Sequence, residues 1–468
     1  MLSPEKESKS MRNCKAFDYI REIRDYAVEK GIQACFHLHI EKSHLMRIGN
    51  SSVSLNTSEH LYRLQIEVLK GRKTGNHTQM GAIESAGYVK RALDIAIEKA
   101  EFGFENNYQP LLKGPSENIE KSDQYDESLE NLDSDYKVKF FKRIIEESGT
   151  QYSYSGSWSS GSVEIFMIST ANKYEAWHLG TDQKLIMVLQ HPVKRWELKK
   201  ELSSWRLKDF KEEDVINQFK GLLPVYENNE GYKIEPGEYT VAFGAGAISE
   251  LLFACTEIGF SGHAYEDKES WLCKNKIGDK IADKSITITD DPDSDLVFGM
   301  AFDDAGTKRK KFPLIENGVF KGLMYSIQTA AKYNKPLTGH TLLYVNNVVL
   351  EKGNDNPDLL ESLKGLGKVL YIPDIHYVGM PSPTKGILTG SSRYNAVLIE
   401  DGNIIAPLFS CRITERVGKI FNNIIRISSK SESYNMSNTY DRRSPFALGM
   451  PSYIVAKNVM MTDSADSF

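Results

Sequence analysis

The spacing of apolar residues changes at Gly31. Before this glycine they recur three or four positions apart, as on one face of an amphipathic helix, at Phe17, Ile20, Ile23 and Ala27. After it they occupy every second position over 32–40, and the same alternation returns over 62–68, which is typical of strands with one polar face. Because a second helical pattern spans 82–100, this region predicts a small α+β unit of a helix, several strands and a second helix.

Composition and patterning divide the rest of the chain into further units. Residues 105–137 are acidic, polar and poor in apolar side chains, which indicates a linker or an exposed excursion. Helical spacing, a long alternation of aromatic and polar residues, and helical spacing again follow over 138–223. A chain of 468 residues is too long for one compact core. We predict an N-terminal α+β domain over 12–104, the acidic linker over 105–137, a middle α+β domain over 138–232 and a C-terminal domain over 233–468.

The C-terminal half is rich in turn signals. Asn317-Gly318 and Asp401-Gly402 each separate two apolar runs, as in tight β-hairpins. Helical spacing is confined there to 247–258 and 325–333. The predicted fold class is therefore α+β, with N-terminal units of helix, strands and helix followed by a large, mostly antiparallel β domain with a few helices.

The composition disfavours several functions. Apolar residues make up 40% of the chain and charged residues 26%, as in a soluble globular protein. A formal charge of -5 gives no general attraction for nucleic acid, and the basic run 308–311 has no interleaved aromatic residues. No stretch approaches the roughly 18 apolar residues of a membrane span. The five cysteines are scattered without a C-x-x-C pair, so we expect a cytoplasmic protein that binds neither nucleic acid nor membrane.

Polar side chains gather at several places without forming a recognisable active site. His263 and Glu266 belong to a carboxylate-rich loop that can bind a divalent ion, although loops are ordinarily polar. The acidic run 290–295 lacks the glycine and the closing glutamate of a calcium loop and fits a solvated turn better. His37 and His39 share one face of a predicted strand, where surface histidines are commoner than metal ligands. Residue spacing alone therefore does not identify a function.

One apolar helical segment contains an unexplained glutamate. Glu250 lies in the run from Ser249 to Ala254, after a turn, GAGA, that joins a predicted strand to the helix. The turn lacks the G-K-[ST] ending of a phosphate-binding loop, so its glycines more simply let the strand turn tightly into the helix. The simplest role for Glu250 is that of a buried residue, hydrogen-bonded near the helix N-terminus, where its charge suits the helix dipole.

Several motifs from Gly237 onward resemble the TldD/PmbA family of peptidases. They occur in the family's order and include GEYTVAFGAGAISELLFA, FDDAGT, LIEDGNIIAPL and PSYIVAKNVMM. In the metal-bearing TldD branch, the helix after the glycine turn contains H-E-x-x-x-H, whose histidines hold zinc while the glutamate is the general base. The matching positions here are Ser249, Glu250 and Ala254, so the glutamate remains and both ligands are replaced. That branch also has a cysteine ligand near the C-terminus, whereas YDRRSPFALGMPSY, residues 440–453, contains none.

By these departures the chain is similar to the PmbA branch, also called TldE, which lacks the zinc motif. The resemblance implies a heterodimer with a TldD-type subunit that cleaves extended or unfolded peptides in peptide maturation and antitoxin turnover. The family label "modulator of DNA gyrase" refers to indirect effects. We therefore expect no cofactor in this chain and zinc in the partner subunit.

Two alternatives remain open, and with them the question whether the chain is itself an enzyme. In the first it is a self-sufficient peptidase, with Glu250 as the base and a cation held by His263 and nearby carboxylates such as Glu266. In the second it is a homodimeric peptide-binding protein without catalysis.

Overall fold

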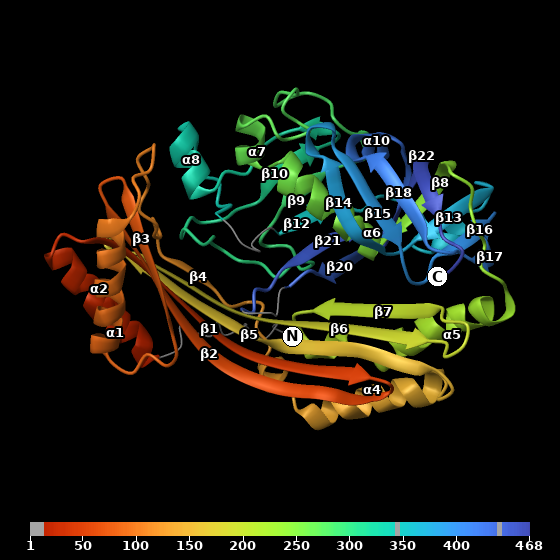
Figure 1. Ribbon diagram of the computed structural model, residues 1–468, viewed down its shortest axis with the longest axis horizontal. Coiled ribbons are helices and arrows are strands. Elements are labelled where there is room, and N and C mark those ends of the chain that lie inside the picture. The colour runs from red at the N-terminus through yellow and green to blue at the C-terminus, as the bar shows by residue number, and fades with distance from the viewer. Residues whose placement is uncertain (1–13, 342–346, 438–441) are drawn as a thin grey trace, which may run out of the picture.

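The computed structural model describes residues 14–341, 347–437 and 442–468. Its N-terminal sheet consists of β1 (Gln33–Gly49), β2 (Ser52–Lys70), β3 (Lys73–Met80), β4 (Ile119–Lys121), β5 (Ser153–Ser169), β6 (Glu175–Gln190) and β7 (Glu197–Ser204). The strand order is β3-β2-β1-β5-β6-β4, with β7 also paired to β6 (Figure 1). All pairs are antiparallel except β4 with β6. The alternation seen in the sequence therefore belongs to one extended sheet.

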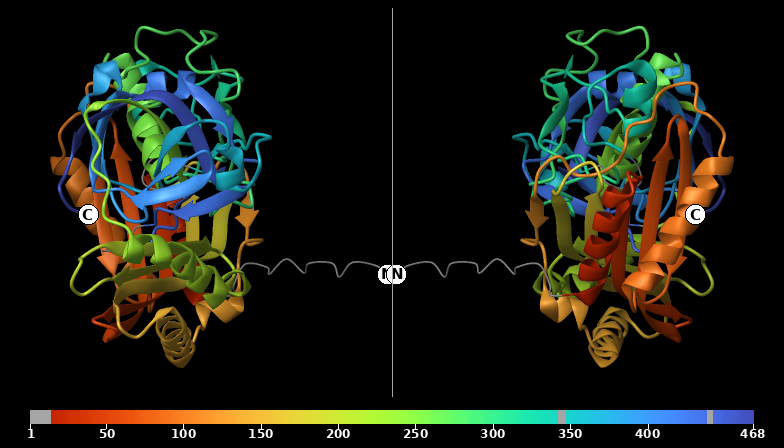
Figure 2. Two further views of the ribbon diagram at one scale, coloured as in Figure 1. Left: turned by 90° about the vertical axis from the view of Figure 1, so that its right-hand side faces the viewer. Right: turned by 90° about the vertical axis from the view of Figure 1, so that its left-hand side faces the viewer.

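Helices cover both ends of this sheet. α1 (Lys15–Glu29) and α2 (Ala86–Phe102) lie side by side at one end (Figure 2). α4 (Ser134–Ser148) and α5 (Glu212–Asn228) contact each other at the opposite end (Figure 1). The predicted apolar face of α1 is confirmed, because its members are at most 6% exposed: Phe17, Ile20, Ile23 and Ala27. Burial of such a face, more than intrinsic propensity, stabilises a short helix.

The two predicted N-terminal units share this single sheet. β1 from the unit over 12–104 pairs with β5 from the unit over 138–232 along most of its length. Residues 105–137 between them contain β4 and α3 (Glu127–Glu130), in which Leu129 is fully buried. The domain boundaries stay a prediction, but the supposed linker is partly built into the fold.

The C-terminal half forms two sheets around α6 (Ala245–Ala254). The nine-stranded sheet contains β8 (Gly237–Gly244), β13 (Lys368–Ile372), β14 (Ile375–Ser382), β15 (Ile387–Ser392), β16 (Val397–Glu400), β17 (Asn403–Pro407), β18 (Cys411–Arg416), β19 (Ile424–Ile427) and β22 (Tyr453–Ser464). The six-stranded sheet contains β9 (Ile288–Asp290), β10 (Phe312–Glu316), β11 (Val319–Phe320), β12 (Val348–Leu350), β20 (Ser431–Asn435) and β21 (Ala447–Pro451). α6 contacts β8, β14 and β22 of the first sheet and β20 and β21 of the second.

The order of the larger sheet is β14-β15-β18-β22-β8-β13-β16-β17, with β19 paired to β22, and that of the smaller is β11-β10-β9-β12-β21-β20. Short helices complete the domain: α7 (Gly262–Glu266), α8 (Ile327–Tyr333), α9 (Leu359–Ser362) and α10 (Val417–Asn422). Most strand pairs are antiparallel, the exceptions in this half being β8 with β13 and β12 with β21 among the described residues. The predicted α+β class, with a mostly antiparallel β domain at the C-terminal end, is confirmed.

Both predicted hairpins are also confirmed. Asn317-Gly318 joins β10 to β11, and Asp401-Gly402 joins β16 to β17. All four residues have positive φ, between 48° and 81°. Two consecutive residues in the left-handed region are what a type I′ turn requires, and Asn, Asp and Gly adopt it most readily.

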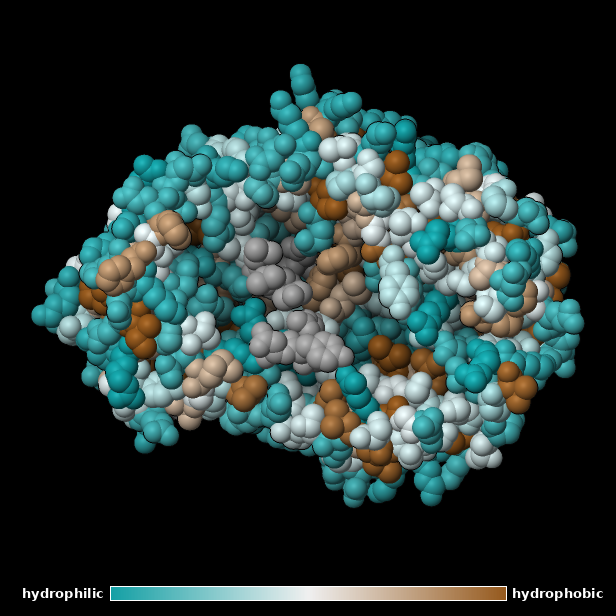
Figure 3. Space-filling view, viewed as in Figure 1, coloured by the Kyte–Doolittle hydropathy of each residue, from teal (hydrophilic) through white to brown (hydrophobic). Residues whose placement is uncertain are grey.

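The N-terminal sheet and the nine-stranded sheet pack against each other through a common apolar core. Trp158 and Trp196 belong to the same buried cluster as Val369, Val397 and Val455. This core fixes the relative position of the two halves. None of the helices in the described ranges is long and apolar enough to span a membrane. Figure 3 shows mostly hydrophilic residues on one face of the molecule, with hydrophobic ones in small separate groups.

Candidate functional site

Helix α6 begins directly against the end of β13. Gly244 is its N-cap, and the backbone N–H of Ala247 donates to the carbonyl of Pro373 at 2.8 Å. A Cβ at Gly246 would clash with the carboxylate of Asp374. The glycines of the GAGA turn therefore allow the helix to approach Pro373 and Asp374 closely, which is a packing role.

The three positions that match H-E-x-x-x-H do not share an accessible face. Ser249 is fully buried, and its hydroxyl donates to the carbonyl of Gly246 at 2.7 Å. Ala254, also buried, has no ligand atom. Positions five apart on an α-helix differ by about 140° in direction, so 249 and 254 point to different surroundings. These residues do not fit a zinc ion, since neither flanking side chain offers it a free donor atom.

Glu250 is the partly exposed member of the three. No hydrogen bond or ion pair involves its carboxylate within the described ranges, so the predicted hydrogen bond near the helix N-terminus is not present. Burial raises the pKa of Glu250, and the nearby carboxylates Asp374 and Glu201 raise it further against the opposing effect of two lysines. The helix then continues into a π-helical turn, Cys255–Gly259, a rare conformation that often occurs at functional sites.

The lysines and carboxylates near Glu250, together with one tyrosine, form a largely buried charged cluster between the N-terminal sheet and the C-terminal domain. It consists of Lys184, Lys199, Glu201, Asp374 and Tyr434. Lys184 comes from β6 and Lys199 and Glu201 from β7, whereas Asp374 follows β13 and Tyr434 lies in β20. The Nζ atom of Lys184 is 3.0 Å from Glu201 Oε1, and that of Lys199 is 3.5 Å from Glu201 Oε2. Lys199 also donates to the carboxylate of Asp374, across 175 positions of sequence. The cluster therefore ties the two halves together.

Mutual pairing favours the ionised forms of Lys199 and Glu201, whereas burial raises the pKa of Asp374 against the opposing effect of Lys199. Burial opposes the charge of Lys199, but Asp374 and Glu201 together raise its pKa. Burial likewise opposes ionisation of Glu201, and Lys184 and Lys199 overcome it and lower the pKa of this carboxyl. Burial raises the pKa of the Tyr434 hydroxyl well above its usual range, so this hydroxyl stays protonated. Two lysines and two carboxylates thus compensate each other, and Glu250 faces them without a direct partner.

A cavity of about 240 Å³ opens beside the cluster. Its walls include side chains of the cluster, backbone at the start of α6, and polar side chains from both halves such as Ser203, Asn395 and Ser433. These groups present both hydrogen-bond donors and acceptors. Such a surface can bind polar backbone groups of a chain laid along it.

The second candidate site, at α7, does not assemble. His263 is more than half exposed, and its Nδ1 atom lies 3.2 Å from Asp267 Oδ2. Glu266 accepts a hydrogen bond from the hydroxyl of Tyr325 at 2.9 Å and pairs with Lys335 at 2.8 Å. No group of three or more His, Cys, Asp or Glu side chains positioned to hold a metal ion occurs in the described part of the chain. His263 and Glu266 therefore have ordinary surface partners.

The interpretation of His37 and His39 as surface residues is wrong. They are 8% and 4% exposed, because a C-terminal segment covers the polar face of β1. His39 Nε2 lies 3.0 Å from the carbonyl oxygen of Arg443, and the backbone N–H of Arg443 donates to Glu41 at 2.8 Å. Burial, with nearby Arg442 and Lys113, lowers the pKa of His37 to about 3. The face of β1 that the sequence predicts to be solvated is therefore an internal interface.

The acidic run 290–295 is not simply a solvated turn. Asp290 is fully buried in β9, where it accepts hydrogen bonds from Arg309 at 2.5 and 2.6 Å and from the backbone N–H of Asn347. Arg309, from the basic run, is buried with it. Each charged run thus gives one member to a buried ion pair, and its other charged members are at least partly exposed.

Residue spacing did not reveal the charged cluster. Lys199 and Glu201 are two apart on β7, so they share a face, but the same alternation occurs on any solvated strand. Asp374 and Tyr434 lie far away in the sequence and in no motif. The only local signal was the GAGA turn, because glycine at position 246 makes room for Asp374.

A model of the PmbA/TldA metallopeptidase C-terminal domain matches residues 236–462. Among curated proteins, a metalloprotease of Methanocaldococcus jannaschii is 25% identical over 193 residues, which cover 38% of this chain and 41% of that protein. A zinc metalloprotease TldD homolog of Saccharolobus solfataricus is 24% identical over 239 residues, which cover 48% of this chain and 49% of that protein. The chain thus matches less than half the length of these relatives.

Similar solved structures extend over nearly the whole chain. TldE from Thermococcus kodakarensis matches with a TM-score of 0.81 and 19% identity, covering 95% of this chain and all of that one. A proposed modulator of DNA gyrase from Thermotoga maritima matches with a TM-score of 0.78 and 15% identity, covering 96% of this chain and all of that one. At these identities the likeness concerns the fold.

Proposed function

We propose that this chain, whose residues 236–462 match the C-terminal domain of the TldD/PmbA metallopeptidase family, is a metal-free, PmbA/TldE-like subunit of a peptidase whose zinc is held by a TldD-type partner. The partner supplies the catalytic centre. This chain helps to enclose an extended or unfolded peptide, in peptide maturation or antitoxin turnover as the family resemblance implies.

The state of α6 is the observation that carries this proposal. Where the zinc-bearing branch has two histidines, this chain has Ser249, whose hydroxyl is bonded within the helix, and Ala254, which has no donor. Glu250 remains, but a general base for metal-assisted hydrolysis needs a metal-bound water to act on. The chain's own residues therefore support peptide binding and positioning better than catalysis.

The cavity beside the charged cluster supports the same assignment. The charged cluster spans the two halves, so its side chains are held in fixed positions beside the cavity, and fixed polar groups bind a ligand at little entropic cost. Main-chain recognition of an extended peptide needs such groups without strong demands on the peptide's side chains. The described cysteines are all free thiols, which fits a reducing, cytoplasmic setting.

Co-expression with a TldD-type paralogue that contains H-E-x-x-x-H tests the proposal. We expect a stable complex with one zinc ion per pair of subunits, which cleaves unfolded casein and leaves a folded protein intact. The isolated chain should contain no stoichiometric zinc and should not cleave. Chelator-sensitive cleavage by the isolated chain would instead support a self-sufficient peptidase. A chain that dimerises with itself, and forms no complex with the paralogue, would support the homodimeric binding protein.

A further inference from the structure

A second cavity lies on the other side of the contact between the two halves. Its volume is about 520 Å³, within the range of roughly 300–1,000 Å³ that is usual for ligand pockets. A pair of hydrogen bonds separates it from the charged cluster: the backbone N–H of Lys199 donates to Asn395 Oδ1 at 2.9 Å, and Asn395 Nδ2 donates to the carbonyl of Lys199 at 2.6 Å. The charged cluster and this cavity are therefore distinct sites.

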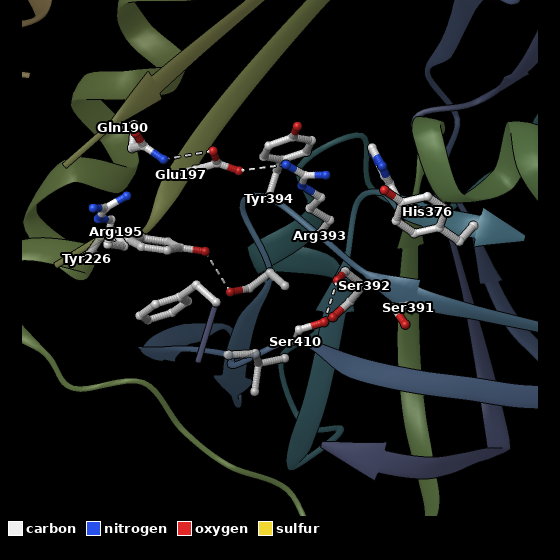
Figure 4. A pocket seen from close by; sticks show the side chains of 14 residues that line it. Gln190, Arg195, Glu197, Tyr226, His376, Ser391, Ser392, Arg393, Tyr394 and Ser410 are labelled. Carbon is white, nitrogen blue, oxygen red and sulfur yellow. Dashed lines mark hydrogen bonds and ion pairs between the residues drawn. The ribbon is translucent and has the colours of Figure 1, made fainter. Parts of the chain in front are cut away.

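The cavity has a buried floor and a cationic mouth. Tyr226, Ala396 and Leu408 form the floor, each at most 4% exposed, and the hydroxyl of Tyr226 donates to the carbonyl of Ala396 at 2.9 Å. Arg195 and Arg393 line the exposed mouth, one from the segment after β6 and the other from the segment after β15 (Figure 4). An apolar group fits the floor, and an anion fits the mouth.

The two arginines differ in the partners that their guanidinium groups already have. Arg393 Nη2 donates to Glu197 Oε2 at 3.2 Å, and the guanidinium lies 4.7 Å from the centre of the Tyr394 ring (Figure 4). The Arg195 guanidinium forms no hydrogen bond or ion pair with any residue of the described ranges. Burial, with Lys199 and Arg393, lowers the pKa of His376 to about 4, so this ring is neutral at physiological pH. Because its guanidinium has no such partner, Arg195 can bind a carboxylate from a ligand.

Unfavourable backbone conformations concentrate at the same cavity. Arg195, Tyr377 and Tyr394, which all line it, have φ values of 66°, 54° and 54°. Apart from Asn and Asp, only Ser51 and Lys268 share this left-handed conformation among the described non-glycine residues. Bulky side chains adopt it at an energetic cost, and such costs gather where a site requires a particular geometry.

We propose that this cavity, the arginine pocket, binds a carboxylate of a peptide together with the apolar side chain next to it. The apolar side chain enters the floor, and the carboxylate lies at the mouth near Arg195 and Arg393. This inference rests on the proposed function in one respect, that the ligand is a peptide. The carboxylate can come from the C-terminus of the peptide or from an acidic side chain.

Fluorescence polarisation with the isolated full chain distinguishes these sources. Three labelled hexapeptides are compared: one ending in phenylalanine as the free acid, its C-terminal amide, and an amide with an aspartate before the phenylalanine. If the C-terminus is recognised, the free acid binds at least about tenfold more tightly than either amide, as expected for the loss of a hydrogen bond to a charged group. If an acidic side chain is recognised, the aspartate-containing amide binds as well as the free acid.

Variants of Arg195 test whether the peptides bind in the arginine pocket. Arg195→Gln should weaken it about tenfold, and Arg195→Lys should retain part of it, because the charge remains while the two-pronged geometry is lost. Lys194→Gln is the matched control, since it removes the same charge from a side chain that donates to the carbonyl of Glu227 outside the pocket. Equal binding by Arg195→Gln and Lys194→Gln, or no binding of any of the three peptides, would overturn the proposal. Formation of the zinc-containing complex is measured separately, so a failure here leaves the proposed function standing.

Discussion

The N-terminal sheet and helix α6 face each other across the cleft with opposite chemistry. The sheet contributes Lys184, Lys199 and Glu201, which form ion pairs with one another, whereas α6 contributes mainly apolar packing and the single carboxylate of Glu250. Every recognisable motif lies on the side of α6, and none lies on the charged strands. Family motifs in this chain therefore mark how the C-terminal domain packs, and the groups that bridge the cleft come from a region without motifs.

A substitution in the charged cluster should have the largest effect on stability. Lys199→Met leaves Asp374 and Glu201 buried with one cation fewer, so it should lower the free energy of unfolding by about 3–5 kcal/mol. Urea denaturation followed by fluorescence measures this change. Lys208→Ala, which removes an exposed lysine from the segment after β7, should change stability by less than about 0.5 kcal/mol. Equal effects of the two substitutions would mean that the cluster does not hold the halves together.

Rebuilding the zinc motif on the α6 side should fail. Ser249→His combined with Ala254→His places two large side chains at buried positions, which should cost about 1–3 kcal/mol in stability from overpacking. Because the two positions point about 140° apart and no supporting residues are in place, we expect no tight zinc binding and no peptidase activity. Zinc titration calorimetry and a casein assay measure the outcome. Tight binding with cleavage would show that α6 rearranges readily and that its site is nearly intact.

Glu250→Gln should produce the smallest effect, with a definite dependence on pH. Since burial raises the pKa of Glu250, the stability associated with its protonated form is present below the usual carboxyl pKa and is lost as pH rises through the raised pKa. Glutamine does not ionise, so the variant should be slightly more stable at about pH 8, by under about 1 kcal/mol, and equal to the parent chain near pH 4. Unfolding at both pH values measures this. Glu29→Gln, at an exposed site, is the control and should show no such trend. A variant less stable at the higher pH would show that the Glu250 carboxylate has a stabilising partner.

Local patterns in the sequence located several elements of the fold. The periods of three to four and of two located α1, β1 and β2, because burial of one face requires that spacing in a helix or a strand. Asn317-Gly318 and Asp401-Gly402 located two hairpins, because type I′ turns require residues that tolerate positive φ. The resemblance predicted the family, whose C-terminal domain model matches residues 236–462, and drew attention to Ser249 and Ala254.

Only the tertiary structure decided which polar residues are internal and which meet. The face of β1 that contains His37 and His39 became buried because a C-terminal segment covers it, and Lys199 found Asp374 across 175 residues. Arg195 and Arg393 likewise line one cavity only because the two halves touch there. The alternation of polar residues along a strand indicates that they share a face. It does not indicate which part of the chain covers that face, because the covering segments are distant in the sequence and their position depends on the packing of the whole molecule.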